Sequence, residues 1–326
     1  MSKHDLVVVA GAGGFIGGHL VKKLREEGFE RIRAVDQKQI SEWYQVFDDV
    51  ETYALDLKRL DSCRAATKDA ASVYNLAADM GGMGFIEKNK AACMLNVLIN
   101  THLLMAAKEA QVERFLFASS ACVYAAEKQT VSAIKPLKES DAYPADPEDG
   151  YGWEKLFGER MCRHYREDFG LETRVVRYHN VYGAHETYRG GREKAPAAVS
   201  RKVATALLSG NHEIEIWGDG EQTRSFTYID DCIRGSELVI NGTYADPVNV
   251  GSSEMVSING LVSIVEEIAG AKLKRNYKLD APLGVRGRNS DNTLIESLFG
   301  WSPATELKAG MATLYRWIHG QLTKSS

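Results

Sequence analysis

The first 36 residues carry the feature that most constrains the fold of this chain. A run of apolar, largely β-branched residues over 6–10 leads directly into a glycine-rich turn, and apolar residues then recur at helical spacing over 15–27. A second strand is expected over 31–36, and it ends on Asp36. A strand, a glycine turn, a helix and a second strand form a βαβ unit, whose parallel strands are covered by helices. The sequence therefore predicts an α/β protein.

The same alternation continues for about half of the chain. Further strands are expected near 52–55, 72–76, 114–118 and 172–177, with helices near 90–110 and 152–169. Residues 1–180 are therefore predicted to form a Rossmann-type, doubly wound parallel sheet. Beyond 180 the pattern changes to glycine-rich loops, strands near 213–217 and 223–228, and helices near 196–208, 229–240, 257–269 and 307–322. Residues 181–326 are expected to form mainly a smaller C-terminal domain, with segments near 229–250 able to return to the first.

Composition narrows the classes of function. Lys and Arg number 40 against 44 Asp and Glu, a formal charge of -4, so nothing favours nucleic acid or an anionic membrane as a partner. We find no run near the roughly 18 apolar residues of a membrane span and no signal-peptide pattern, and expect a cytoplasmic protein. Five cysteines, with no CxxC pair, argue against a disulfide framework and a zinc site. No metal site is expected.

The glycine turn has the properties of a dinucleotide site. Glycines at 11, 14 and 17 allow a tight turn and let backbone N–H groups approach a pyrophosphate at a helix N-terminus. Asp36 can accept hydrogen bonds from both ribose hydroxyls and repels a 2′-phosphate, which favours NAD over NADP. Its alternative role is to cap a loop. The expected cofactor contacts of this region are Gly11, Gly14, Phe15, Ile16, Gly17, Asp36, Asp56, Leu57 and Ala77.

A tyrosine and a lysine four residues apart supply a candidate for proton transfer. Tyr151 and Lys155 fall on one face of the predicted helix, and both are expected beside the cofactor. A nearby ammonium and the positive nicotinamide favour the phenolate, which would bring the tyrosine pKa toward neutrality. Ser120 follows a strand at the carboxyl edge of the sheet, where it can hydrogen-bond a reacting hydroxyl. YxxxK also occurs by chance, because both residues are common on helix surfaces.

Taken together, these motifs resemble the extended short-chain dehydrogenase/reductase family, whose members carry GxxGxxG, a Ser or Thr before a Val-Tyr pair, and YxxxK. The resemblance covers nearly the whole chain. It implies a Rossmann domain that holds NAD, a smaller C-terminal nucleotide-sugar-binding domain, and a homodimer built through helices that include the YxxxK helix. By direct motif match, Tyr151, Lys155 and Ser120 take the catalytic roles of the family.

Less common stretches resemble members of the family that epimerise GDP-mannose at C3 and C5, giving GDP-L-galactose and GDP-L-gulose. The matching stretches are ADMGGMG at 78–84, SSACVY at 119–124, GGREKAPAA at 190–198, EMVS at 254–257 and VRGRNSDN at 285–292. In those enzymes the positions of Cys122 and Lys194 are the acid/base pair. Transient oxidation at C4 acidifies the C3 and C5 hydrogens, so that two such groups can invert each centre through an enolate. The lysine then needs a lowered pKa, which burial and a nearby Arg192 or Arg224 would promote.

Binding of a nucleotide-diphosphate sugar requires local cations and hydrogen bonds. Arg224 and Arg286 can grip the diphosphate, and Arg288 either does the same or faces solvent. Trp217 is expected to fill the core rather than to stack on the base, and the pair at 230–231 to cap a helix rather than to bind a metal. The expected substrate contacts are Gly81, Ser120, Cys122, Asn180, Glu193, Lys194, Lys202, Arg224 and Arg286. The remaining cysteines and the eight histidines are expected to be structural or on the surface.

Other activities stay open at this stage. A GDP-4-keto-sugar epimerase-reductase, of the GDP-fucose synthase kind, shares the Ser, Cys, Tyr and Lys pattern but uses NADPH, which Asp36 disfavours. A nucleotide-sugar 4-epimerase or 4,6-dehydratase would not need Cys122 and Lys194. A nucleotide-binding regulator on the same fold would bind NAD without turnover. The stretches 125–126 and 184–186 depart from the resembled enzymes, so the balance of C3 against C5 inversion and the nucleotide base are left open.

Overall fold

A seven-stranded parallel sheet forms the centre of the protein, seen in a computed structural model that describes residues 1–281 and 284–324. The strand order is β11-β6-β5-β4-β1-β2-β3. The strands are β1 (Val7–Ala10), β2 (Ile32–Asp36), β3 (Glu51–Ala54), β4 (Ser72–Asn75), β5 (Arg114–Ser120), β6 (Glu172–Tyr178) and β11 (Val248–Val250). The predicted doubly wound parallel sheet is confirmed. Because the chain turns back between β1 and β4, the carboxyl ends of these two strands border a crevice where such sheets bind ligands.

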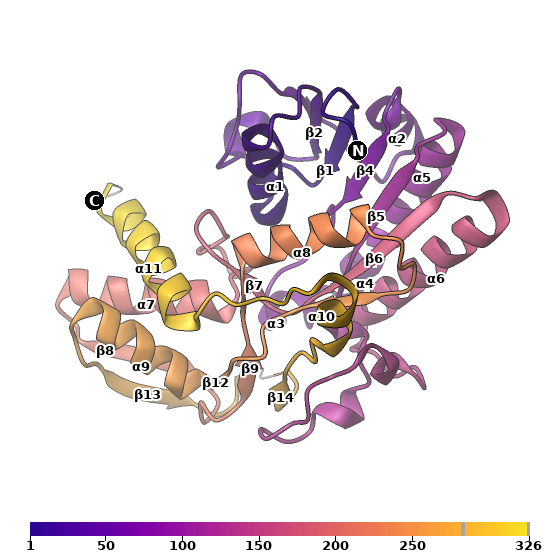
Figure 1. Ribbon diagram of the computed structural model, residues 1–326. Helices are drawn as coiled ribbons and strands as arrows, with labels where there is room; N and C mark the ends of the chain where they lie inside the picture. Colours follow the sequence, from indigo (N-terminus) through magenta and orange to yellow (C-terminus); the bar gives the residue numbers. More distant parts are fainter. Residues whose placement is uncertain (282–283, 325–326) are drawn as a thin grey trace.

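Helices cover both faces of this sheet, which explains why its inner strands are largely apolar. One face packs against α1 (Phe15–Glu26), α8 (Ile229–Asn241) and α10 (Thr293–Phe299), and the other against α2 (Leu60–Thr67), α5 (Asn96–Glu109) and α6 (Tyr151–Phe169) (Figure 1). Side chains of β1 alternate between the two cores: Val7 and Val9 face the first, and Val8 faces the second. Each core buries one of the two sets of alternate residues, so that no strand face is left for polar side chains.

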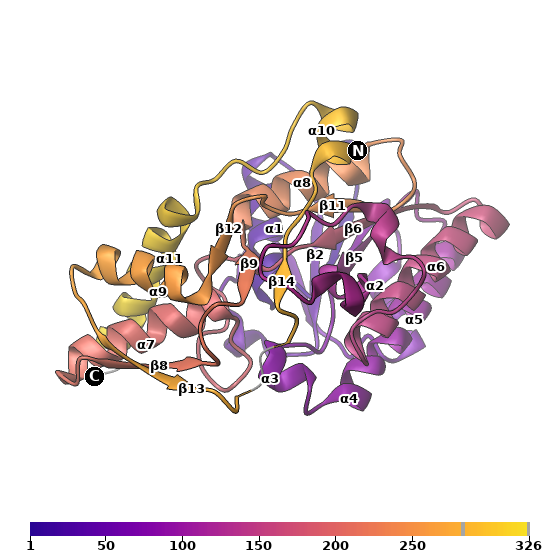
Figure 2. The same ribbon diagram turned by 90° about the horizontal axis from the view of Figure 1, so that it is seen from below.

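A smaller lobe has its own apolar core. It consists of α7 (Ala195–Ser209), α9 (Ile258–Ala269) and α11 (Leu307–Lys324), packed against the parallel pair β8 (Glu213–Trp217) and β13 (Lys274–Lys278). Figure 2 shows β8 and β13 beside α7, at the end of the molecule away from the large sheet. Two further small sheets pair β7 (Val181–Tyr182) with β10 (Thr227–Tyr228), and β9 (Thr223–Ser225) with β12 (Met255–Ser257) and β14 (Gly287–Arg288).

The chain passes between the two lobes more than once. After β10 it returns to the large sheet as α8 and as β11, which pairs with β6. After β14 it returns again as α10, whose Ile295 is fully buried in the same core as α1. Part of the stretch 181–326 therefore belongs to the Rossmann-type lobe. The return of α10 has no counterpart in the sequence pattern.

Several elements differ from their predicted form. The helix expected over 90–110 is divided into α4 (Lys90–Met94) and α5, and the strand expected over 223–228 is interrupted at Phe226, which points into the core of the smaller lobe. The remaining short helices are α3 (Met83–Ile86), η1 (Ile40–Glu42), η2 (Ala121–Val123), η3 (Ala126–Gln129) and η4 (Glu139–Ala142). Most of these lie in loops, where apolar periodicity gives no signal.

One helical stretch corrects the expectation about membrane spans. Lys90–Glu109 is long and apolar enough to cross a membrane by length and composition, with a mean hydropathy of 1.3. Leu103 and Leu104 are buried against the central sheet, whereas Met94, Leu95 and Leu98 of the same stretch are 37–50% exposed. The position of the stretch at the edge of the core thus accounts for part of its apolar composition, and the expectation that no run comes near a span was wrong.

Candidate functional site

The glycine turn between β1 and α1 has the shape that a dinucleotide requires. Gly11 has φ +88°, and a side chain there would collide with the backbone of Leu76 and Ala77. A Cβ on Gly17 would overlap the carbonyl oxygen of Gly11. Gly14 caps α1 without a side-chain hydrogen bond, so the first N–H groups of this helix are directed at the crevice. Phe15 and Ile16 follow at the start of the helix, as predicted for cofactor contacts.

The acid at the end of β2 lies where the sequence predicts it. Asp36 is the last residue of β2 and is buried, and one of its carboxylate oxygens accepts a hydrogen bond from Lys38 N at 3.0 Å. The second oxygen is left for another donor such as a ribose hydroxyl. Asp56 follows β3 and accepts from Lys58 N, and Leu57 is buried beside it. The carboxylates fit a cofactor with a free 2′-hydroxyl.

The proposed proton-transfer residues are brought together at the carboxyl edge of the sheet. Tyr151 begins α6 and Lys155 lies one turn later, with its Nζ 5.4 Å from the centre of the phenol ring. Ser120 ends β5 and hydrogen-bonds to the phenol of Tyr151, while its Oγ accepts from Cys122 N at 3.2 Å. All of these residues except Ser120 are almost fully buried. The sequence motif thus produces one contiguous group.

The charges around Tyr151 favour the neutral phenol in this structure. Burial, followed by the negative charge of Glu154, raises the pKa of Tyr151 well above its ordinary value, and the hydrogen bond with Ser120 opposes the rise. Glu154 is itself buried, and its Oε2 lies 3.7 Å from Lys155 Nζ. When only the protein's own side chains are considered, burial therefore outweighs the lowering of the Tyr151 pKa that was expected from the lysine. A positive charge in the crevice would lower the pKa of Tyr151, which is the direction expected from the sequence.

Cys122 lies beside two arginines. It is buried in η2, directly after β5, and shares a small apolar cluster with Tyr151, Cys93 and Ile86. Arg288 Nη1 donates to the Cys122 sulfur at 3.6 Å. Arg224 is also close enough for its charge to interact with this thiol. The Cys122 thiol therefore lies beside two cationic side chains and in the same cluster as Tyr151.

Arg288 is held in place by residues that sequence reasoning missed. Its guanidinium donates to Gln129 Oε1 at 2.7 Å and to the carboxylate of Glu148, and only 4% of the residue is exposed. Glu148 N in turn donates to the carbonyl oxygen of Cys122 at 3.0 Å. The alternative that Arg288 faces solvent is wrong. The only sign of this network in the sequence was the VRGRNSDN stretch, which did not indicate the residues that Arg288 contacts.

Lys194 lies apart from Cys122. It is the N-cap of α7, and its charge interacts with the buried carboxylate of Glu186 and with Cys232. Burial raises the pKa of Glu186 to about 8, and the positive charge of Lys194 opposes this rise. Within residues 1–281 and 284–324, no hydrogen bond or ion pair joins Lys194 to Cys122. A substrate that uses both groups has to lie between them.

The loop that carries Lys194 packs on the segment after β4. Gly82 N donates to Arg192 O at 3.0 Å, and Arg192 stacks over the ring of Phe85 and pairs with Asp79 at 2.6 Å. A Cβ on Gly81 would meet the Phe85 side chain and the Arg192 backbone. The absence of a side chain at Gly81 therefore serves this packing, and its expected contact with the substrate stays a prediction.

The remaining predicted substrate contacts are engaged with protein groups. Arg224 donates to Thr223 O at 2.7 Å and to Val285 O at 2.6 Å, and burial lowers its pKa to about 10. Arg286 pairs through both of its terminal nitrogens with Asp219, at 2.9 Å each. The other three bond elsewhere: Asn180 to Ser225 O, Glu193 to Arg201 and Lys202 to Glu215 O.

Four expectations about other residues are corrected or tested by the structure. Trp217 is 41% exposed, so it does not fill the core. Neither Asp230 nor Asp231 makes a side-chain cap to α8; Asp231 instead accepts from Thr305 N at 2.9 Å. His179 is completely buried and its Nε2 lies 3.0 Å from Asn249 Oδ1, a structural position. The remaining cysteines are buried free thiols that pack in the cores, as expected; they are Cys63, Cys93, Cys162 and Cys232.

A buried ion pair supports the strand ends that carry the site. Arg177 on β6 makes two parallel hydrogen bonds to Glu159 on α6, at 2.7 and 2.8 Å. Ser119, next to Ser120, donates to the same carboxylate at 2.5 Å. Arg177 also donates to Glu139 O at 2.7 Å. Because the pair links β5, β6 and α6, it fixes the relative position of Ser120 and Tyr151.

Comparisons with known proteins agree with this geometry. The sequence pattern of the NAD dependent epimerase/dehydratase family matches residues 7–251. Among curated relatives, GDP-mannose 3,5-epimerase 1 of Oryza sativa subsp. indica is 46% identical over 319 residues, which cover 98% of this chain and 82% of that protein.

Two solved structures of similar shape are nucleotide-sugar 4-epimerases. UDP-glucose 4-epimerase of Thermotoga maritima, solved with UDP-glucose, gives a TM-score of 0.87 at 24% identity and covers 97% of this chain and 99% of its own. UDP-glucuronic acid 4-epimerase of Bacillus cereus, solved with UDP-glucuronic acid and NAD, gives 0.82 at 26% identity and covers the same fractions. At 24% identity, the similarity to the Thermotoga maritima enzyme shows the fold alone.

Proposed function

Because the chain belongs to the NAD dependent epimerase/dehydratase family, we propose that it converts GDP-mannose to GDP-L-galactose and GDP-L-gulose by epimerisation at C3 and C5. The observation that carries this proposal is the buried Cys122, which lies beside Tyr151 in one cluster and receives a hydrogen bond from Arg288. An enzyme that inverts only C4 has no use for a second proton-transfer group next to the tyrosine. The similarity to the rice epimerase supports the same substrate.

The residues that would hold NAD are the turn of Gly11, Gly14 and Gly17, the N-terminus of α1, and Asp36. These groups fit the cofactor, because the turn has no room for side chains and, within the described part of the chain, only one Asp36 oxygen accepts a hydrogen bond. NAD held there would supply a reversible hydride acceptor for the C4 carbon of the sugar. The net reaction therefore consumes no reductant.

Tyr151 exchanges the proton of the C4 hydroxyl in this mechanism. Ser120 hydrogen-bonds the phenol and orients the hydroxyl, and Lys155 supplies positive charge 5.4 Å from the centre of the phenol ring. The tyrosine receives the proton as the C4 carbon becomes a carbonyl and gives it back at the end of the cycle. Glu154 keeps Lys155 in the buried helix face by its charge.

Cys122 and Lys194 exchange protons with the carbons on either side of C4. A carbonyl at C4 makes the C3 and C5 hydrogens acidic, so that one group removes a proton from one face while the other delivers a proton to the opposite face. Arg288 donates to the Cys122 sulfur, and Arg224 lies near the same thiol. The charge of Lys194 interacts with the buried carboxylate of Glu186. We assign Cys122 as the base and Lys194 as the acid.

The nucleotide diphosphate would be held by cations of the smaller lobe. We propose Arg224 and Arg286 as the principal contacts, with Lys202, Asn180 and Glu193 also lining the site. Arg286 would exchange its exposed partner Asp219 for phosphate oxygens, a small change because both residues are partly solvent-accessible. Arg224 is already oriented by two backbone carbonyl groups.

Incubation with GDP-mannose in D2O tests this function. We expect deuterium at C3 and C5, together with new epimers, when no reductant is added; the readout is NMR and mass spectrometry.

Cys122→Ala should abolish deuterium uptake while NAD binding is kept. Cys162→Ala, which removes a buried thiol about three turns along α6 from Tyr151, serves as the matched control. Deuterium uptake by the Cys122→Ala variant at the wild-type rate would reject the mechanism. Absence of label and product in the NAD-loaded wild type would reject the substrate.

We also propose that the protein is a homodimer. The outer faces of α4, α5 and α6 expose several large apolar side chains, as an interface would require. These are Met94, Leu95, Leu98, Trp153 and Phe157, each 37–50% exposed. Sedimentation or light scattering should give twice the chain mass of 36.1 kDa. Trp153→Glu should yield a monomer, whereas Leu279→Glu, an exposed residue of the smaller lobe, should not; a wild-type monomer contradicts this proposal.

A further inference from the structure

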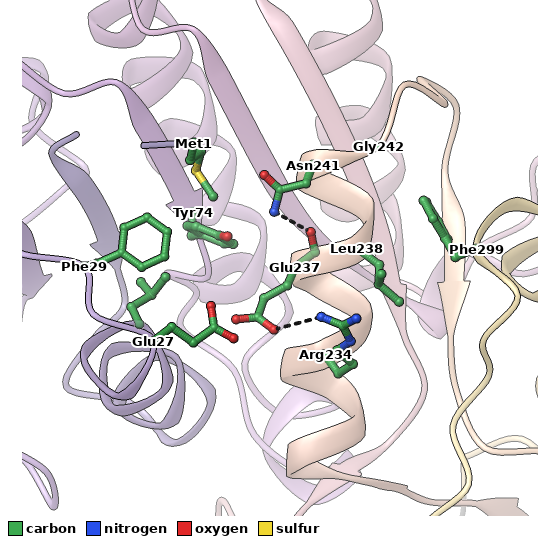
Figure 3. Close-up of a pocket in the computed structure, with 11 residues that line it drawn as sticks. Met1, Glu27, Phe29, Tyr74, Arg234, Glu237, Leu238, Asn241, Gly242 and Phe299 are labelled. Atoms are coloured by element: carbon green, nitrogen blue, oxygen red, sulfur yellow. Dashed lines mark hydrogen bonds and ion pairs between the residues drawn. The ribbon is translucent and has the colours of Figure 1, made fainter. Parts of the chain in front are cut away.

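A second pocket lies away from the crevice, at the opposite end of α1. Its volume is about 350 Å³, within the range of sites for small ligands. Figure 3 shows that it is bounded by the end of α1, by β4 and by α8. The lining residues are Met1, Leu24, Glu27, Phe29, Tyr74, Arg234, Glu237, Leu238, Asn241, Gly242 and Phe299. None of them belongs to the proposed catalytic or cofactor site.

Two carboxylates meet in this pocket. Glu237 projects from α8 and Glu27 from the end of α1, and the two side chains point toward each other (Figure 3). Glu237 is only 6% exposed, yet neither of its carboxylate oxygens has a hydrogen-bond partner among the described residues. Burial, followed by the charge of Glu27, raises the pKa of Glu237 to about 7. Two unshared acceptors at a buried position can receive hydrogen bonds from a ligand.

A third unsatisfied polar atom lies on the same wall. Tyr74 is completely buried on β4, and its hydroxyl has no hydrogen-bond partner within the described part of the chain. Leu24, Phe29, Leu238 and Phe299 form the apolar part of the wall, and Arg234 and Asn241 also line the pocket. The pocket thus combines a polar end, with carboxylate and phenol groups, and an apolar body.

The nearby cations do not satisfy Glu237. Lys3 and Lys23 pair with Glu27, at 3.6 and 3.2 Å, and their side chains are 45% and 41% exposed. Arg234 approaches Glu237 only to 3.9 Å and is 55% exposed. Exposed pairs of this kind contribute little and are readily displaced. The buried carboxylate therefore keeps its capacity for a cation with hydrogen-bond donors.

We propose that this pocket binds a small organic cation, an ammonium attached to an apolar body. The ammonium would donate to Glu237 and to Tyr74, and the apolar body would cover Phe29 and Phe299. An anion is disfavoured by the two carboxylates. A metal ion is disfavoured because no cluster of three Asp, Glu, His or Cys residues occurs among the residues described. A purely apolar ligand would leave the buried carboxylate without a partner.

The pocket is independent of the proposed reaction. Glu27 follows the last residue of the 12-residue helix α1, whose first turn is assigned to the cofactor, and a helix of this length spans about 18 Å. Substitution of Glu237 therefore leaves the crevice unchanged. Binding at this site and turnover of a nucleotide sugar can be measured separately.

Binding of 2-phenylethylamine to the full chain tests the proposal. At pH 8 the amine is a cation, and 2-phenylethanol is its neutral analogue of similar shape. Calorimetry and ligand-observed NMR should show binding of the amine, and the alcohol should bind at least tenfold more weakly. Glu237→Gln should weaken amine binding at least tenfold, and Glu27→Gln should weaken it to a smaller extent.

Glu26→Gln is the matched control, because Glu26 lies on the exposed side of α1 and pairs only with Lys22 in the region described. Its affinity for the amine should equal that of the wild type. Equal binding of the amine and the alcohol, unchanged amine binding in both Glu237→Gln and Glu27→Gln, or no binding of the amine to the wild type would each overturn the proposal. Thermal melting of each variant verifies that it is folded.

Discussion

Removal of one partner of the buried Arg177–Glu159 pair should strongly destabilise the protein. Both side chains are at most 3% exposed, and Glu159 accepts two hydrogen bonds from the guanidinium and one from Ser119. Arg177→Met leaves a buried carboxylate without its counter-ion, and Glu159→Leu leaves a buried guanidinium. Each uncompensated charge is expected to cost about 3–5 kcal/mol in the free energy of unfolding.

The double variant Arg177→Met/Glu159→Leu provides the contrast. It removes both charges and keeps apolar volume at the site, so its loss of stability should be well below that of either single variant. For a chain of 326 residues, a change of about 4 kcal/mol corresponds to a shift in Tm of about 6 °C.

Urea denaturation and calorimetry of the three variants measure these differences. Single substitutions that cost less than about 1 kcal/mol, or a double variant as unstable as the sum of the singles, would refute the view that charge compensation holds this junction together. Arg163→Met is the matched control, because it removes an exposed arginine that pairs with Glu167 on the same helix. That variant should keep nearly the stability of the wild type.

Three further substitutions test other parts of the structure. Gly17→Ala should reduce NAD affinity at least tenfold, measured by calorimetry, because its Cβ overlaps the Gly11 carbonyl and displaces the turn; unchanged affinity would contradict this view of the turn. Asp36→Ala should weaken the binding of NAD and reduce the preference of the protein for NAD over NADP. An unaltered ratio of the two dissociation constants would argue against the ribose contact. Glu237 is protonated more readily in the folded chain, where its pKa is about 7, than in the unfolded chain, so the wild type should lose stability as pH rises from about 4.5 to 7. After allowance for solvent screening, Glu237→Gln should therefore be about 2 kcal/mol more stable than the wild type at pH 8. At pH 5 the two proteins should be nearly equal in stability. If urea denaturation gives the same difference at both pH values, the raised pKa of Glu237 is not its cause.

The central sheet could be predicted from sequence because its determinants are local. Continuous apolar runs identify strands buried on both faces, and the glycine turn follows the first of them directly. The Ser120, Tyr151 and Lys155 group was also predictable, since the carboxyl ends of parallel strands share one edge. Local pattern alone was sufficient for these features.

The surroundings of Cys122 could not be predicted, because they depend on distant segments. Arg288 is 166 residues from Cys122 and 140 residues from Glu148 in sequence, yet the three are in contact. Trp217 resembled a core residue by type alone, but β8 places alternate residues on opposite faces, so that Ile216 is buried while Trp217 faces out. Such outcomes are decided by tertiary packing, for which periodicity gives no information.

The position of β11 at the edge of the sheet has a consequence for synthesis on the ribosome. β6 is complete at Tyr178, but its outer neighbour begins only at Val248, about seventy residues later. At about 5–20 residues per second, the growing chain presents an unpaired strand edge for several seconds before β11 emerges. Polypeptides truncated within that interval carry an open edge that can pair with other chains. The order in which the chain visits its two lobes thus sets the period during which the nascent protein is most prone to aggregate.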